Sequence, residues 1–188
     1  MDTLRVFIAV DTPAEVRSVL ARLSADLARS TTAVRWEGPA KFHCTVRFLG
    51  NVERSRLAAL EEEIRRAAAV PPLSVAYTGL GFFPPGAPPR IVWAGIRDGH
   101  GDLRVLEERV SAGLARLGFP REERAFHPHV TLGRVRDGAD VRTLIETVQT
   151  RTFDCPPVIV PAVEIMQSVP GPRGSAYEVI RSIPLAAP

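Results

Sequence analysis

The sequence has few of the residues that build metal centres, disulfide frameworks or membrane spans. Its two cysteines, Cys44 and Cys155, form no CxxC pair and belong to no Cys/His cluster at metal-ligand spacing. A disulfide framework and a metal site are therefore not expected, and a reducing compartment fits. The apolar run 6–10 is too short for a signal or transmembrane segment, and residues 1–3 form no basic region before it. We expect a cytoplasmic protein with no metal, no cofactor and no membrane partner.

Lysine is nearly absent as well. Lys41 is the only lysine among 24 basic residues, so arginine carries nearly all of the positive charge. Such a bias commonly follows from genome composition, whereas the functional alternative is that some arginines grip phosphate through their planar fork. The formal net charge of +3 is too small to indicate nucleic-acid binding by itself.

Length and composition describe an ordinary globular chain. The 188 residues suit one domain, or two small lobes that share a core. Apolar residues make up 45% of the chain and charged residues 24%, which is typical of globular proteins. A chain of this length buries roughly 70% of its unfolded surface, so it needs no covalent staples. We expect a single domain, 1–188, acting as a monomer.

Hydrophobic periodicity predicts alternating strands and helices. The first helix, for example, starts at Pro13 and repeats apolar residues at helical spacing from Val16 to Leu27. The predicted strands are 4–10, 34–36, 42–49, 73–80, 90–96, 126–135, 158–168 and 176–183, and the predicted helices are 13–29, 54–69, 102–117 and 140–149.

The order strand, helix, strand, helix, strand occurs twice along the chain. Arg5 precedes His43 by 38 residues, and Arg90 precedes His129 by 39. This spacing predicts an α+β fold of two pseudo-symmetric lobes, with antiparallel sheets facing a central cleft and helices outside. The lobes would span about 1–83 and 90–188, with a possible crossover of the terminal strands. The proline-rich segment 84–89 is the predicted connection between them.

Each half carries the same short motif on a predicted strand. His43-Cys44-Thr45-Val46 and His129-Val130-Thr131-Leu132 both read His, any residue, Thr, aliphatic. Residues two apart on a strand share a face, so each histidine projects together with its threonine. One such motif is a common accident of surface or core. Two copies, at matching places in a repeated order and in a chain with four histidines, indicate a shared catalytic cleft.

Two imidazoles and two hydroxyls suit in-line cleavage of a phosphoester. The attacking water and the leaving oxygen lie on opposite sides of phosphorus, so a base and an acid are needed across the site from each other. Imidazole has an ordinary pKa near 6.5 and serves either role close to neutral pH. The threonine hydroxyls can hydrogen-bond the non-bridging oxygens. The motifs do not distinguish which histidine is the acid.

The sequence resembles the two-histidine (2H) phosphoesterases, and among them the RNA 2′,3′-cyclic phosphodiesterases, which are LigT-like proteins formerly called 2′-5′ RNA ligases. The resemblance spans nearly the whole chain in order, through segments 5–10, 41–50, 89–95 and 126–134 and then Ser168, Gly174, Tyr177 and Pro184-Leu185. It implies a bilobal fold and hydrolysis of a terminal 2′,3′-cyclic phosphate to a 2′-phosphate. The substrates would be RNA ends or nucleotides that carry this group.

The resemblance also implies residue roles. His43 would protonate the leaving 3′ oxygen, His129 would activate water, and Thr45 and Thr131 would hold the phosphate. Small departures occur at Cys44 and Val46, where leucine is frequent, and these should not touch the chemistry.

Further candidates lie around the two motifs. The resemblance suggests that Phe48 and Arg134, each five residues after a motif histidine, hold the terminal nucleotide by stacking or through phosphate. An odd offset points away from the histidine face, so this role requires a bulge or strand end, which Gly50 and Gly133 could permit. The remaining expectations are Arg47 pointing into the cleft, His127 on its rim, Trp93 in the core, and Ser168 and Tyr177 as structural residues near it.

Three other functions remain open. A phosphodiesterase for small nucleotides, such as ADP-ribose 1″,2″-cyclic phosphate, would carry the same motifs. So would a reversible 2′-5′ RNA ligase. The third alternative, a non-catalytic protein that binds RNA ends, would not need both histidines.

Overall fold

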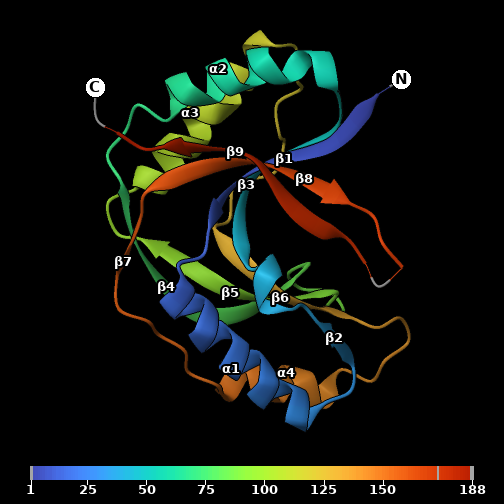
Figure 1. Cartoon of the computed structure of the whole chain (residues 1–188). Coiled ribbons are helices and arrows are strands. Elements are labelled where there is room, and N and C mark those ends of the chain that lie inside the picture. Colours follow the sequence, from blue (N-terminus) through green and yellow to red (C-terminus); the bar gives the residue numbers. More distant parts are fainter. Residues whose placement is uncertain (1, 173, 187–188) are drawn as a thin grey trace.

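One continuous antiparallel sheet runs through the computed structural model, which describes residues 2–172 and 174–186 (Figure 1). Eight of its nine described strands follow the order β7-β4-β5-β6-β3-β1-β8-β9, and the ninth, β2, pairs with β6 beside this path. The strands are β1 (Thr3–Asp11), β2 (Val34–Trp36), β3 (His43–Glu53), β4 (Leu73–Phe83), β5 (Ile91–Asp98), β6 (His129–Val135), β7 (Val158–Val160), β8 (Ala162–Val169) and β9 (Ala176–Pro184).

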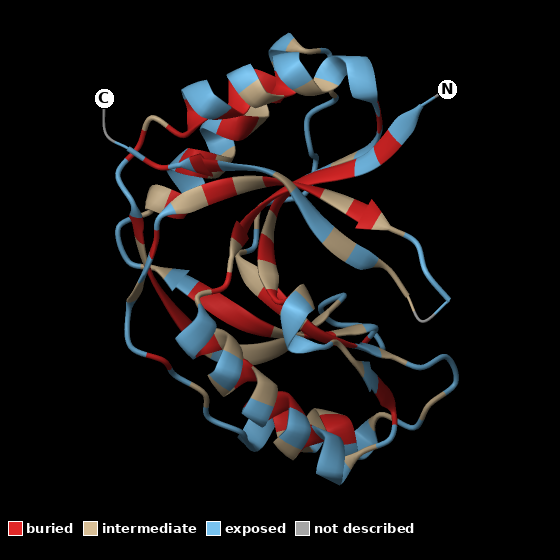
Figure 2. Ribbon diagram, viewed as in Figure 1, coloured by how far each residue is buried: buried red, intermediate tan, exposed pale blue. Residues whose placement is uncertain are grey.

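Two pairs of helices cover the sheet. α1 (Ala14–Ser30) packs with α4 (Arg142–Thr150), and α2 (Leu57–Ala67) packs with α3 (Asp102–Arg116). Figure 1 shows the two pairs at opposite ends of the molecule, with the strands between them. α1 forms because apolar residues recur every three or four positions, and this stripe, from Val16 to Leu27, is buried. Figure 2 shows the same alternation of buried and exposed residues along the helices.

The sheet consists of two halves that meet at a single point. We call β3, β1, β8 and β9 the first half-sheet, and β6, β5, β4, β7 and β2 the second. The halves are joined where β3 pairs with β6, and the one residue pair there is Cys44 with Val130. Both side chains are fully buried. The predicted α+β fold with two lobes around a cleft is confirmed.

The repeated order maps onto the structure with one exchange. The first repeat is β1-α1-β3-α2-β4 and the second is β5-α3-β6-α4-β8. The last strand of each repeat lies in the other repeat's half-sheet, since β4 pairs with β5 and β8 pairs with β1. The prediction that 84–89 connects the lobes is wrong. This segment is the turn of the β4–β5 hairpin, with Phe83 paired to Ile91, because its prolines and Gly86 favour a tight reversal.

Proline sets two further element boundaries. The strand predicted from residue 126 begins only at His129, because Pro128 has no N–H to donate to a neighbouring strand. The strand predicted over 158–168 is interrupted at Pro161, so that β7 joins the second half-sheet and β8 the first. Within the described part of the chain, no helix combines the length and apolarity needed to cross a bilayer.

Candidate active site

The two motifs meet at the junction of the half-sheets. Cys44 follows His43 as Val130 follows His129, so the joining pair lies on the pseudo-twofold axis of the repeat. An antiparallel register through this pair sets His43 opposite Thr131 and Thr45 opposite His129. Cys44 and Val130 point into the core, and the four motif side chains point the other way. All four line one cleft of about 1020 Å³.

Each motif ends in a bulge, after which the side chains of the strand alternate in the opposite phase. On β3, Thr45 pairs with Ala9 and Arg47 with Ile8, so Val46 has no partner. On β6, Leu132 is skipped in the same way between Thr131 and Gly133. An extra residue shifts the alternation by one, so the residue five after each histidine returns to the histidine's face. Phe48 and Arg134 consequently line the same cleft as the motif residues.

The His43 ring lies among aromatic side chains of the first half-sheet. The Phe7 and Tyr177 rings each have their centroids 5.0 Å from it, the latter edge-on. Nε2 lies 3.2 Å from the Thr45 hydroxyl oxygen. Burial lowers the pKa of His43 to about 4, a backbone hydrogen bond with Lys41 opposes this, and a charge on His129 adds to the lowering.

The His129 ring is held in one orientation by a backbone carbonyl just before β6. Its Nδ1 lies 2.7 Å from the His127 carbonyl oxygen, which can only accept, so Nδ1 carries the proton. In the neutral ring Nε2 is therefore an unprotonated acceptor. The Phe83 ring packs edge-on at 4.9 Å. Burial lowers the pKa of His129, the bond to the His127 carbonyl raises it, and a charge on the His127 ring lowers it again.

A partly buried carboxylate lies between two cations of the cleft. Glu37, with 13% of its side chain exposed, accepts a 2.9 Å bond from the Lys41 ammonium and lies 3.5 Å from Nε of Arg134. Arg90 also lines the cleft. Sequence reasoning missed Glu37 and Lys41. The signal for Lys41 was its place two residues before His43, which matches the place of His127 before His129.

Four further expectations have mixed outcomes. His127 is exposed and lines the cleft, as expected for a rim residue. Arg47 borders the cleft, but its Nη2 donates to the Pro120 carbonyl, because the bulge turns this side chain away from the histidine face. Trp93 is only half-buried, and its ring packs 4.8 Å from that of His127 rather than in the core. Tyr177 lines the cleft itself.

Metal-binding side chains do not gather at this site. Within residues 2–172 and 174–186, no three His, Cys, Asp or Glu side chains are placed to hold a metal ion. What the cleft offers is the two motif imidazoles and their two threonine hydroxyls, with aromatic rings and several cations around them, and together these can bind and cleave a phosphoester.

Two His-x-Thr strands that face one cleft across a splayed antiparallel sheet define a phosphoesterase of the two-histidine class. The model of the family described as LigT like phosphoesterase matches residues 10–93 and 96–177, and the chain belongs to this family. The two matched segments correspond to the two repeats.

Curated relatives and solved structures are similar over nearly the whole chain. The RNA 2′,3′-cyclic phosphodiesterase of Archaeoglobus fulgidus is 30% identical over 179 residues, covering 95% of this chain and 98% of the relative. That of Thermotoga maritima is 31% identical over 181 residues, covering 94% and 93%. The crystal structure of a Thermus thermophilus protein, 26% identical, has a TM-score of 0.82 and covers 98% of this chain and 99% of its own. Escherichia coli LigT, 24% identical, shows the same fold, with a TM-score of 0.78 over 99% of both chains.

Proposed function

We propose that the chain hydrolyses the terminal 2′,3′-cyclic phosphate of RNA to a 2′-phosphomonoester, by acid–base catalysis that needs no metal ion. The observation that carries this proposal is that His43, Thr45, His129 and Thr131 line one cleft on either side of the single β3–β6 pair, Cys44 with Val130. The curated relatives named RNA 2′,3′-cyclic phosphodiesterase support the choice of substrate.

The reaction requires one proton to be taken and one to be given. His129 Nε2 removes a proton from water as the water oxygen attacks phosphorus. The bond between phosphorus and the 3′ oxygen then breaks on the opposite side. His43 gives its proton to that oxygen, which leaves a 3′ hydroxyl and a 2′-phosphate. The fixed Nδ1 proton of His129 supports its role as the base, because Nε2 then has a free lone pair.

The acid must be protonated when substrate is bound. Burial holds the pKa of His43 at about 4, so the ring is neutral in the empty cleft at pH 7. A phosphodiester anion placed between the two rings favours the imidazolium and raises this pKa. Substrate binding would thus load the acid. After turnover His43 is neutral and His129 carries the proton taken from water, which it loses to solvent before the next cycle.

The other cleft residues hold the substrate. Thr45 and Thr131 would donate hydrogen bonds to the non-bridging oxygens, where negative charge develops. Phe48, with 64% of its surface exposed, would stack on the terminal base. Arg134, on the equivalent position of the other strand, would pair with phosphate or ribose oxygens.

The test compares wild type with His43→Ala and His129→Ala on an oligoribonucleotide ending in a 2′,3′-cyclic phosphate, with and without EDTA. We expect both variants to lose about 10²- to 10⁴-fold in kcat and EDTA to have no effect. His100→Ala is the matched control, because His100 is an exposed loop residue outside the cleft. Full activity in a folded His43 or His129 variant would contradict the mechanism, and loss with EDTA would contradict metal independence.

A further inference from the structure

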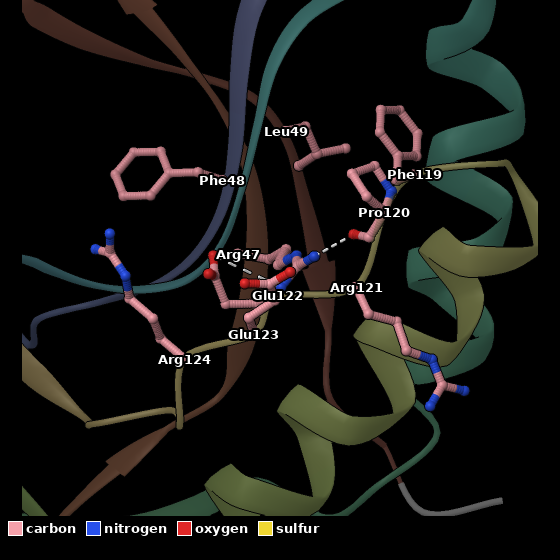
Figure 3. A pocket seen from close by; sticks show the side chains of 9 residues that line it. All are labelled: Arg47, Phe48, Leu49, Phe119, Pro120, Arg121, Glu122, Glu123 and Arg124. Carbon is pink, nitrogen blue, oxygen red and sulfur yellow. Dashed lines mark hydrogen bonds and ion pairs between the residues drawn. The ribbon is translucent and has the colours of Figure 1, made fainter.

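A smaller cavity lies at the loop between α3 and β6 (Figure 3). We call it the side cavity. Its volume is about 350 Å³, and it is lined by residues 47–49 and 119–124. Four of these residues, Arg47, Phe48, Glu122 and Arg124, also line the cleft, so the two spaces adjoin.

An exposed aromatic ring stands where the two spaces meet. Phe48 leaves 64% of its surface exposed and touches only one other ring of the wall, that of Phe7, at 5.6 Å, among the contacts of the described residues. A large apolar side chain on a strand beside a polar cleft is a stacking platform for a nucleobase. Because Phe48 borders both spaces, a stack that begins on it in the cleft can continue into the side cavity.

Positive charge lies beneath and beside this ring. Arg47 is 7% exposed, and its Nε and Nη1 have no hydrogen-bond partner among the described residues, with Glu122 Oε2 3.8 Å from Nη1. A buried charge acts over a longer distance than an exposed one, because little water screens it. Figure 3 shows Arg124 extending on the Phe48 side of the cavity, whereas Arg121 points away from it.

The loop also provides carboxylates, which can accept hydrogen bonds from a nucleobase. Glu122 and Glu123 also line the side cavity, and carboxylates accept hydrogen bonds from the amino and imino groups of bases. Their presence disfavours a second phosphate deep in the cavity and favours a base there. The linking phosphate would then lie near Arg124, at the boundary with the cleft.

We propose that the side cavity is a subsite for the nucleotide on the 5′ side of the terminal cyclic-phosphate nucleotide. The cavity lies at the small end of the size range of ligand sites, which suits one nucleotide. This inference rests on the proposed function and narrows it, because the enzyme becomes one that prefers chain ends to free cyclic mononucleotides.

The test measures kcat/KM on a cyclic mononucleotide and on the di- and trinucleotides that end in it. We expect roughly a 5- to 100-fold gain from one to two nucleotides, which is the effect of one stacked base. The third nucleotide should add less than twofold, since the cavity holds one. Equal kcat/KM for mono- and dinucleotide would overturn the subsite and leave the proposed reaction standing.

Two variants that each remove one arginine, one inside the side cavity and one outside it, locate the effect. Arg124→Ala should lower the ratio of dinucleotide to mononucleotide kcat/KM about three- to tenfold. Arg104→Ala removes the same charge from an exposed residue of α3 that lines neither the cleft nor the side cavity, and it should leave the ratio unchanged. An equal fall in both variants would assign the preference to general electrostatics and overturn the subsite.

A binding measurement separates the subsite from the chemistry. Dinucleotide and mononucleotide carrying a terminal 2′-phosphate are titrated into the wild type and into Arg124→Ala. Tighter binding of the dinucleotide, reduced by Arg124→Ala, supports the subsite even if no substrate is turned over, in which case only the proposed reaction fails. Equal binding of both ligands contradicts the subsite.

Discussion

His43 and His129 occupy equivalent positions on β3 and β6, yet the side chains packed against the two rings differ. Phe7 and Tyr177 contact His43, while Phe83 and the exposed His127 lie beside His129. The bulge after each motif then delivers unlike residues to the cleft, Phe48 from one strand and Arg134 from the other.

This difference separates what the fold imposes from what each half contributes. The backbone places two imidazoles and two hydroxyls symmetrically, as an in-line displacement requires on its two sides. The surroundings are unequal, as an acid and a base must be if they are to hold different protonation states. The aromatic ring on one side and the guanidinium on the other likewise suit a nucleotide, whose base and phosphate are unlike.

The largest effect should come from the histidines. His43→Asn and His129→Asn should each lower kcat by about 10²- to 10⁴-fold, and each should remove a different limb of the bell-shaped pH profile of the wild type. Loss of the base removes the fall in rate at acid pH, and loss of the acid removes the fall at alkaline pH. Single-turnover rates across the pH range measure this. The opposite assignment of limbs would reverse the roles of the two residues.

The two motif threonines should contribute equally to catalysis, because they occupy equivalent positions in the two halves. Thr45→Val and Thr131→Val keep the shape of the side chain and remove the hydroxyl, so each should lower kcat on the order of 100-fold. Thr→Ser variants keep the hydroxyl and should retain most of the activity. A much smaller loss for one valine variant would show that only one hydroxyl contacts the reacting phosphate.

Phe48 and Arg134 should affect binding in different ways. Phe48→Leu should raise KM about tenfold with the salt dependence unchanged, because stacking involves no charge. Arg134→Gln should raise KM by a similar factor and lower the slope of log KM against log salt by about one, as expected for one lost phosphate contact. KM measured across a salt series tests both, and an unchanged slope for Arg134→Gln would exclude a contact with phosphate.

The smallest effect concerns acid stability. The folded state holds the pKa of His43 at about 4, below the ordinary 6.5, so the unfolded chain binds more protons between these values. The free energy of unfolding of the wild type should therefore fall as pH drops through this window. His43→Asn should lessen that fall by roughly 1–3 kcal/mol. Urea unfolding at about pH 7 and pH 4.5 measures it, and equal falls for variant and wild type would contradict the cause.

Hydrophobic periodicity was sufficient to predict most of the fold. It predicted a helix over 13–29, and α1 spans Ala14–Ser30, because one apolar stripe determines both the helix and its buried face. The repeated order likewise predicted the two lobes. The exchange of β4 and β8 could not be predicted in this way, because the choice of a pairing partner depends on tertiary packing rather than on local sequence.

The candidate site was likewise predictable only where local sequence patterns determine it. His43, Thr45, His129 and Thr131 could be placed on one face from strand alternation alone. Phe48 and Arg134 needed a bulge, and the bulges occur at Val46 and Leu132 rather than at the glycines. These positions could not be predicted, because an aliphatic residue in a strand gives no sign of a bulge. Glu37 was missed because its role depends on two cations that lie apart in the sequence. The roles of these residues and the extent of the domain, 1–188, stay predictions.

The exchanged strands β4 and β8 have a consequence for how such a chain can be divided. Cleavage in the 84–89 hairpin would give two fragments, each of which carries the strand that completes the other's half-sheet. In each fragment alone, strands would lack the neighbours to which they hydrogen-bond in the intact sheet. A mixture of the two fragments could restore these pairings without a covalent link. Each repeat therefore depends on the other for the strand that extends its half-sheet, so one repeat by itself could complete its sheet by pairing with a second copy, as in a strand-swapped dimer.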